Sequence, residues 1–174
     1  VFVDRDADPV MAERIVVNAK CQRPGVCNAM ETLLVDRALA PAFLPQVARP
    51  LGEHQVELRA DATAGGILRA AAFHPALAVK DATDADYFTE YNDSILNVRV
   101  VDDVQQAIEH IAHYGSAHSD AIVTANAATA RRFLDEVDSA VVYWNASTRF
   151  TDFGQFGMGA ESGISTDKVG ARGP

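Results

Sequence analysis

The chain has 174 residues, of which 48% are hydrophobic and 22% charged, and its formal net charge at pH 7 is −9. This composition is typical of one globular domain and excludes a disordered chain. An acidic chain without a Lys/Arg cluster argues against nucleic acids and anionic membranes as partners. No apolar run approaches the roughly 18 residues of a membrane span, and no signal-peptide pattern opens the chain, so we expect a cytoplasmic protein.

Strand-like and helix-like segments alternate along the chain. The expected strands are residues 1–4, 32–36, 56–61, 76–80, 94–103, 120–124 and 140–145. The expected helices are residues 9–21, a helix from 37 that Pro50 and Gly52 end, and residues 62–73, 104–114 and 127–137. Residues 81–93 are expected as a loop, and periodicity is lost from Ala146 onward. This alternation predicts an α/β fold with a mostly parallel sheet and helices on both faces.

Cys27 is the first candidate for chemistry. It follows the turn signal Pro24-Gly25 and begins "CNAMETLL", which is good helix sequence. In the first turn of a helix, unpaired N–H groups and the helix dipole stabilise a thiolate, and the same groups could hold an oxyanion. Arg23 could add positive potential, whereas Cys21 ends a helix, where the dipole acts the other way. Local sequence alone still favours a buried, structural Cys27, and both cysteines are expected to be free thiols.

The Gly-rich segment after the last expected strand is the second candidate. It lacks both G-x-G-x-x-G and G-K-[ST], so neither a dinucleotide fingerprint nor a P-loop is indicated. It follows the carboxyl end of a strand, where open α/β sheets bind ligands. Its arginine suits an anionic small molecule. A surface loop without function is an equal alternative. Its hydrogen-bonding and aromatic side chains are Asn145, Ser147, Thr148, Arg149, Phe150, Phe153 and Phe156.

The histidines give weaker signals. His110 and His113 are three residues apart on an expected helix, but such a pair on an exposed face is usually solvated, and we expect no metal site. No histidine lies in a recognisable partner motif for a cysteine nucleophile, although a Cys–His pair stays open.

Three motifs together carry a specific resemblance. "NAKCQRPGVCNAMETLLV", "VYWNASTRFTDFGQFGMGAESGIST" and the closing "ARGP" resemble the gamma-glutamyl phosphate reductase (glutamate-5-semialdehyde dehydrogenase) family of the aldehyde dehydrogenase superfamily. The resemblance covers essentially all 174 residues. It implies that residues 1–174 are an aldehyde dehydrogenase-like catalytic domain cut from a longer chain. The nicotinamide-binding domain and an oligomerisation element would then lie largely outside it.

The resemblance also implies roles for individual residues. Cys27 would attack the acyl phosphate of L-glutamyl 5-phosphate, and NADPH would reduce the resulting thioester to glutamate 5-semialdehyde, in the second step of proline biosynthesis. Glu90 matches the glutamate that holds the nicotinamide ribose, although Asn92 replaces the usual aromatic residue two positions later. Gly170 and Ser162 depart from the family pattern in the tail. Substrate contacts are implied for Arg23, Asn145, Ser147, Thr148, Arg149 and Phe156.

The same resemblance implies that NADPH is bound mainly by a domain missing from this chain, so the fragment alone should be inactive. The full-length protein should be a homo-oligomer, with glutamate 5-kinase as a candidate partner. Two alternatives from other classes stay open: a non-catalytic α/β module that binds a small molecule and buries Cys27, and a cysteine hydrolase or acyltransferase that uses one of the histidines.

Overall fold

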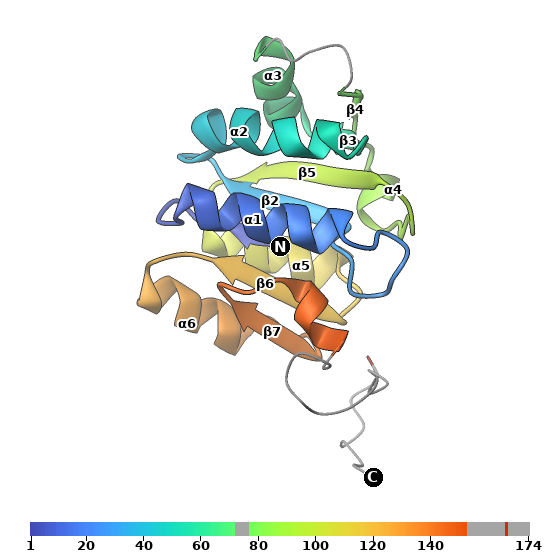
Figure 1. The fold of residues 1–174 in the computed structure, drawn as a ribbon. Coiled ribbons are helices and arrows are strands. Elements are labelled where there is room, and N and C mark those ends of the chain that lie inside the picture. Colours follow the sequence, from blue (N-terminus) through green and yellow to red (C-terminus); the bar gives the residue numbers. More distant parts are fainter. Residues whose placement is uncertain (72–76, 153–165, 167–174) are drawn as a thin grey trace.

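The sheet is parallel throughout. The computed structural model describes residues 1–71, 77–152 and 166. Within these residues the strands lie in the order β4-β3-β5-β2-β1-β6-β7, and each neighbouring pair is parallel (Figure 1). The strands are β1 (Phe2–Val3), β2 (Thr32–Asp36), β3 (Glu57–Ala60), β4 (Val79–Asp81), β5 (Ile95–Val101), β6 (Ser119–Val123) and β7 (Val141–Trp144). The predicted α/β class is therefore confirmed.

The helices connect these strands. They are α1 (Pro9–Cys21), α2 (Ala40–Glu53), α3 (Ala62–Ala70), α4 (Asp84–Tyr87), α5 (Val104–Tyr114) and α6 (Ala127–Glu136), followed by the 3₁₀ turn η1 (Thr148–Asp152). Four of them begin at an Asx cap whose side chain accepts hydrogen bonds from backbone N–H groups of the first turn. Such caps satisfy donors that the helix itself leaves unpaired. The caps are Asp8, Asp61, Asp103 and Asn126.

Helices cover both faces of the sheet, and α1 and α5 lie on opposite sides of it (Figure 1). Consecutive strand residues point to opposite faces: Leu33 and Val35 of β2 join the core under α1, α2 and α3, whereas Leu34 joins the core under α5 and α6. In the second core Phe2 stacks on Phe133 with ring centroids 6.3 Å apart. The central strands are buried on both faces, which explains their nearly continuous apolar sequence.

The helix expected to begin at Cys27 is absent. Residues 24–29 form turns and bends, and β2 begins at Thr32. A helix through Leu33 and Leu34 would remove a central strand and both of its contacts with the cores, so burial overrides the helical propensity of this segment. Cys27 therefore has no helix N-terminus behind it, and the predicted dipole effect on its thiol is wrong.

Helix α2 and the expected loop 81–93 also differ from expectation. Helix α2 continues through Pro45 and Pro50 to Glu53, because its buried stripe, which includes Phe43 and Leu51, keeps it packed where the prolines omit hydrogen bonds. The expected loop 81–93 contains α4, one helical turn closed by a capping box between Thr83 and Asp86.

Candidate active site at the amino edge of the sheet

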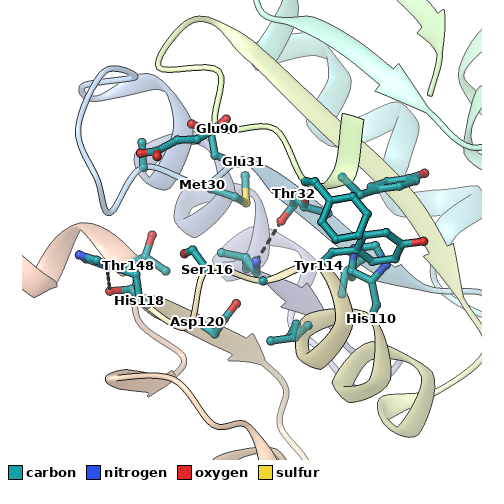
Figure 2. A pocket seen from close by; sticks show the side chains of 18 of the residues that line it. Met30, Glu31, Thr32, Glu90, His110, Tyr114, Ser116, His118, Asp120 and Thr148 are labelled. Carbon is teal, nitrogen blue, oxygen red and sulfur yellow. Dashed lines mark hydrogen bonds between the residues drawn. The ribbon is translucent and has the colours of Figure 1, made fainter. Parts of the chain in front are cut away.

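A pocket of about 340 Å³ opens where β1, β2 and β6 begin and α5 ends (Figure 2). This volume is in the range of small-molecule sites. The pocket lies at the amino edge of the strands, whereas the sequence analysis placed ligand binding at a carboxyl end. Its chemically functional lining residues are Cys27, Glu31, Tyr87, Glu90, His110, Tyr114, Ser116, His118, Asp120 and Thr148.

Cys27 lies in the loop between α1 and β2, and its side chain is exposed. The next residue, Asn28, is buried and fixed by η1. The Thr148 hydroxyl donates to the Asn28 carbonyl at 2.8 Å, and the Asn28 amide donates to Asp152 at 2.7 Å. Arg149 donates to the Asn28 side-chain oxygen as well. The nucleophile candidate thus projects from a loop that is held immediately beside it.

Arg149 has protein acceptors around its guanidinium. Besides Asn28, it donates to Asp152 at 2.6 Å and to Gln22 at 3.2 Å, and its side chain is only 9% exposed. Ser147 is also buried, and its hydroxyl accepts from the backbone N–H of Arg149 at 3.2 Å. Arg149 therefore connects η1 to the Cys27 loop, while Arg23 in that loop is exposed.

Asn145 lies at the carboxyl edge of the sheet, in the residue after β7. It has a positive φ of 55°, a conformation that asparagine tolerates better than most residues. Its side chain accepts from the Thr124 N–H at 2.9 Å and donates to the Thr124 carbonyl at 3.0 Å, which joins the ends of β6 and β7. Asn145 is not among the described residues that line the pocket with Cys27 and Thr148, and the predicted contact Phe156 lies outside the described residues.

Glu90 is exposed and lines the same pocket as Cys27. The segment that carries it is fixed by Asp86, which accepts from Thr83 at 2.7 Å, from Tyr91 at 2.8 Å and from Arg59. Hydrogen bonds from Thr83, together with those from Arg59 and Tyr91, hold the pKa of Asp86 below its usual range. Asp86 is therefore ionised at neutral pH and anchors the Glu90 segment.

Glu31 is a pocket carboxylate that sequence reasoning missed. It pairs at 3.1 Å with Lys20, whose side chain is fully buried. Burial lowers the pKa of Lys20 and raises the pKa of Glu31, and the attraction between the two groups offsets each effect. Lys20 lies on α1 and Glu31 lies just before β2, 11 residues later, so no local sequence motif predicts the pair.

The two pocket histidines lie at opposite ends of it (Figure 2). His110 is buried, not solvated as expected, and its Nδ1 lies 2.9 Å from Arg99. Burial and the charge of Arg99 lower the pKa of His110 to about 3, so its ring is neutral near pH 7. His118 lines the same pocket as Thr148, and its Nδ1 is 2.8 Å from the Ser119 hydroxyl. Sequence reasoning did not single out His118, because no spacing relates it to Cys27.

The described residues contain no group of three or more His, Cys, Asp or Glu side chains that could hold a metal ion. Among the same residues, no helix is both long and apolar enough to cross a bilayer.

Known proteins share both the sequence and the fold. Gamma-glutamyl phosphate reductases from Carboxydothermus hydrogenoformans and Moorella thermoacetica are 58% and 57% identical to the chain over 174 residues. The chain is similar to gamma-glutamyl phosphate reductases along its whole length. The resemblance expected from the motifs is confirmed. The matches cover 100% of this chain and 40% of each relative, so the chain spans about two fifths of the length of these curated relatives. No protein-family model matches the chain.

Solved structures agree. The gamma-glutamyl phosphate reductase of Thermotoga maritima superposes with a TM-score of 0.90 and 48% identity, over 99% of this chain and 40% of that one. The gamma-glutamyl phosphate reductase of Saccharomyces cerevisiae superposes with a TM-score of 0.70 and 32% identity, over 95% of this chain and 42% of that one. An engineered glycolyl-CoA reductase with bound NADP⁺ superposes with a TM-score of 0.66 at 12% identity, over 92% of this chain and 43% of that one. This likeness shows that the fold is shared.

Proposed function

We propose that this chain is the catalytic-cysteine domain, residues 1–174, of an NADPH-dependent reductase that converts L-glutamyl 5-phosphate to glutamate 5-semialdehyde in proline biosynthesis. The observation that carries the proposal is the setting of Cys27: an exposed thiol in a pocket, next to a buried asparagine fixed by η1. This arrangement suits a positioned nucleophile. It argues against a binding module that merely buries the cysteine. Similarity to gamma-glutamyl phosphate reductases supplies the substrate.

The proposed chemistry is acyl transfer followed by reduction. The Cys27 sulfur attacks the acyl carbon, the carbon–oxygen bond to phosphate breaks, and a thioester remains. NADPH, when bound, supplies the hydride that reduces this thioester. The resulting thiohemiacetal collapses to the aldehyde and frees the cysteine. Of the predicted substrate contacts, Thr148 is proposed to meet the substrate directly because it lines the pocket with Cys27. Arg23, Ser147 and Phe156 stay proposed contacts. Asn145 and Arg149, whose side chains bond to protein partners, are proposed instead to hold the fold and the position of Cys27.

The described residues fit the nicotinamide end of the cofactor. Glu90 offers an exposed carboxylate that can accept hydrogen bonds from ribose hydroxyls, and Tyr87 and Tyr114 give the pocket flat apolar walls. We propose that most of the NADPH site lies on parts of a longer protein, so the chain alone is inactive. The longer protein is proposed to be cytoplasmic and homo-oligomeric, with glutamate 5-kinase as a candidate partner.

One observation keeps a second candidate function in view. Cys27 and His118 line one pocket, and a cysteine with a nearby imidazole is also the machinery of hydrolases and acyltransferases. Such an enzyme would hydrolyse an activated ester without any cofactor. A reductase would instead require both NADP⁺ and phosphate for continuous turnover of the semialdehyde.

The test is a cysteine substitution in the full-length protein that contains this chain. Cys27→Ser should lower phosphate-dependent NADP⁺ reduction with glutamate 5-semialdehyde by on the order of 10³-fold or more, since the nucleophile is lost. Cys21→Ser is the matched control, because Cys21 is half-buried at the end of α1 and away from the pocket lining, and it should keep activity. Full activity in Cys27→Ser would refute the proposal.

A further inference from the structure

His118 is a pocket residue that the chemistry above leaves unused. It precedes β6 and lines the same pocket as Cys27 and Thr148 (Figure 2). Its Nδ1 is 2.8 Å from the Ser119 hydroxyl. The Ser119 oxygen lies 3.0 Å from the hydroxyl of Thr151, which is 3.2 Å from that of Tyr143.

This chain of hydroxyls fixes the ring without fixing its protonation state. A hydroxyl group can donate to a neutral Nδ1 or accept from a protonated one, because its hydrogen rotates. The ring is thus held in one orientation whether it carries one proton or two. With Nδ1 bonded to Ser119, Nε2 on the other side of the ring is the nitrogen available to a molecule in the pocket.

The acyl-phosphate step needs a proton donor in this pocket. When the carbon–oxygen bond breaks, its electron pair moves to the bridging oxygen, which already belongs to a dianionic phosphate. Expulsion of a trianion is unfavourable near neutral pH, so a general acid at that oxygen lowers the barrier. His110 cannot serve, because burial and Arg99 lower its pKa to about 3. Lys20 is buried and paired with Glu31.

We propose that His118 is the catalytic residue that protonates the departing phosphate. This inference rests on the proposed function. As the Cys27 sulfur bonds to the acyl carbon and the carbon–oxygen bond breaks, the proton on Nε2 passes to the bridging oxygen, and hydrogenphosphate leaves. The ring becomes neutral and regains a proton from solvent, and no group changes oxidation state. The Ser116 hydroxyl in the same pocket can donate to another phosphate oxygen. Ser119 and Thr151 act as positioning residues.

The reverse reaction of the full-length protein separates this step from hydride transfer. Without phosphate, glutamate 5-semialdehyde and NADP⁺ should give a burst of one NADPH per active site as the thioester forms. Added phosphate must lose a proton when it attacks the thioester, and His118 accepts that proton. In His118→Gln we expect an unchanged burst, whereas phosphate-dependent turnover falls by roughly 10²–10⁴-fold. The unchanged burst also shows that the variant is folded.

His113→Gln is the matched control, since His113 is an exposed histidine on α5 outside the pocket lining, and both phases should match the unsubstituted protein. Undiminished phosphate-dependent turnover in His118→Gln would overturn the inference. Loss of burst and turnover by the same factor would overturn it too, because His118 would then act before phosphate enters. If the unsubstituted protein shows no semialdehyde-dependent NADPH formation, the proposed function itself fails, and the inference with it.

Discussion

The two edges of the sheet use their polar side chains in different ways. At the carboxyl edge, these side chains close the ends of strands. Asp4 accepts from the Thr124 hydroxyl at 2.7 Å, Asp36 pairs with Arg5 at 3.0 Å, and Asn145 bonds the backbone of Thr124. Each of these groups is engaged by its neighbours in the fold.

At the amino edge, the polar side chains of Cys27, Glu90, Ser116 and His118 instead surround an open pocket. Under the proposed function ligands bind at this amino edge, so the usual position at the carboxyl ends of parallel strands is a poor guide for this chain. A better guide to the ligand site is the edge at which polar side chains face a cavity. In this chain the loops after α1 and α5 line that cavity.

After the losses expected at Cys27 and His118, the largest effect is expected at Arg149, which connects η1 to the Cys27 loop. Arg149→Lys keeps the charge but loses the planar fork that reaches Asn28, Asp152 and Gln22. A small displacement of the nucleophile should lower kcat by roughly 10–100-fold, with KM little changed. Steady-state kinetics of the full-length protein measure this, with Arg131→Lys, an exposed arginine on α6, as the control.

The opposite kinetic pattern would change the role of Arg149. A rise in KM for L-glutamyl 5-phosphate at constant kcat would mean that its guanidinium binds the substrate anion, as the sequence suggested.

At the carboxyl edge, a substitution should act on stability rather than on catalysis. Asn145→Gly keeps the positive φ but removes both hydrogen bonds to Thr124. We expect the free energy of unfolding to fall by about 1–2 kcal/mol, measured by urea denaturation of the chain. KM should stay constant in the full-length protein. A raised KM would instead support the predicted substrate contact of Asn145 and weaken the contrast between the edges.

A further effect on stability is a dependence on pH that comes from His110. Its folded pKa of about 3 lies below the ordinary value of 6.5, so the unfolded chain takes up a proton that the folded chain excludes. Stability from this group is complete above pH 6.5 and is lost progressively as the pH falls from 6.5 toward about 3, by at most about 1.4 kcal/mol per pH unit.

Urea denaturation at several pH values in this range checks the expectation. His110→Gln should remove this component of the slope, while His113→Gln should keep it. The comparison between variants matters because Glu31, whose pKa is raised by burial, contributes a slope of opposite sign in all of them. Identical slopes in the unsubstituted chain and His110→Gln would mean that His110 is not held neutral.

The sequence predicted the fold well because periodicity is a local signal. The bounds of α1 and the caps Asp103 and Asn126 could be read directly, since each depends on neighbours within a few positions. The strand at residues 32–36 was predicted correctly, but the helix start at Cys27 was not. Helical propensity is local, whereas the loop that carries Cys27 is held by η1, far along the chain.

The site was only partly predictable. Cys27 and Glu90 entered through motifs, and the structure brings them to one pocket. His118 and Glu31 were not predicted from motifs, because they are recognised only by their place in the pocket and by their contacts in the folded chain. The anchor of Asn28 depends on Thr148, 120 residues away, and no spacing rule relates such distant positions.

That separation has a consequence for biosynthesis. The Cys27 loop leaves the ribosome long before η1, whose residues fix Asn28. At about 5–20 residues per second, synthesis of the intervening 120 residues takes roughly 6–24 s. During that interval the Cys27 thiol is present, but the contacts of η1 with Asn28 that fix its loop are not. A nascent or prematurely terminated chain therefore carries Cys27 in a loop that is not yet held in position. Any reactivity of Cys27 that depends on the fixed position of its loop thus requires that β6, β7 and η1 have been synthesised.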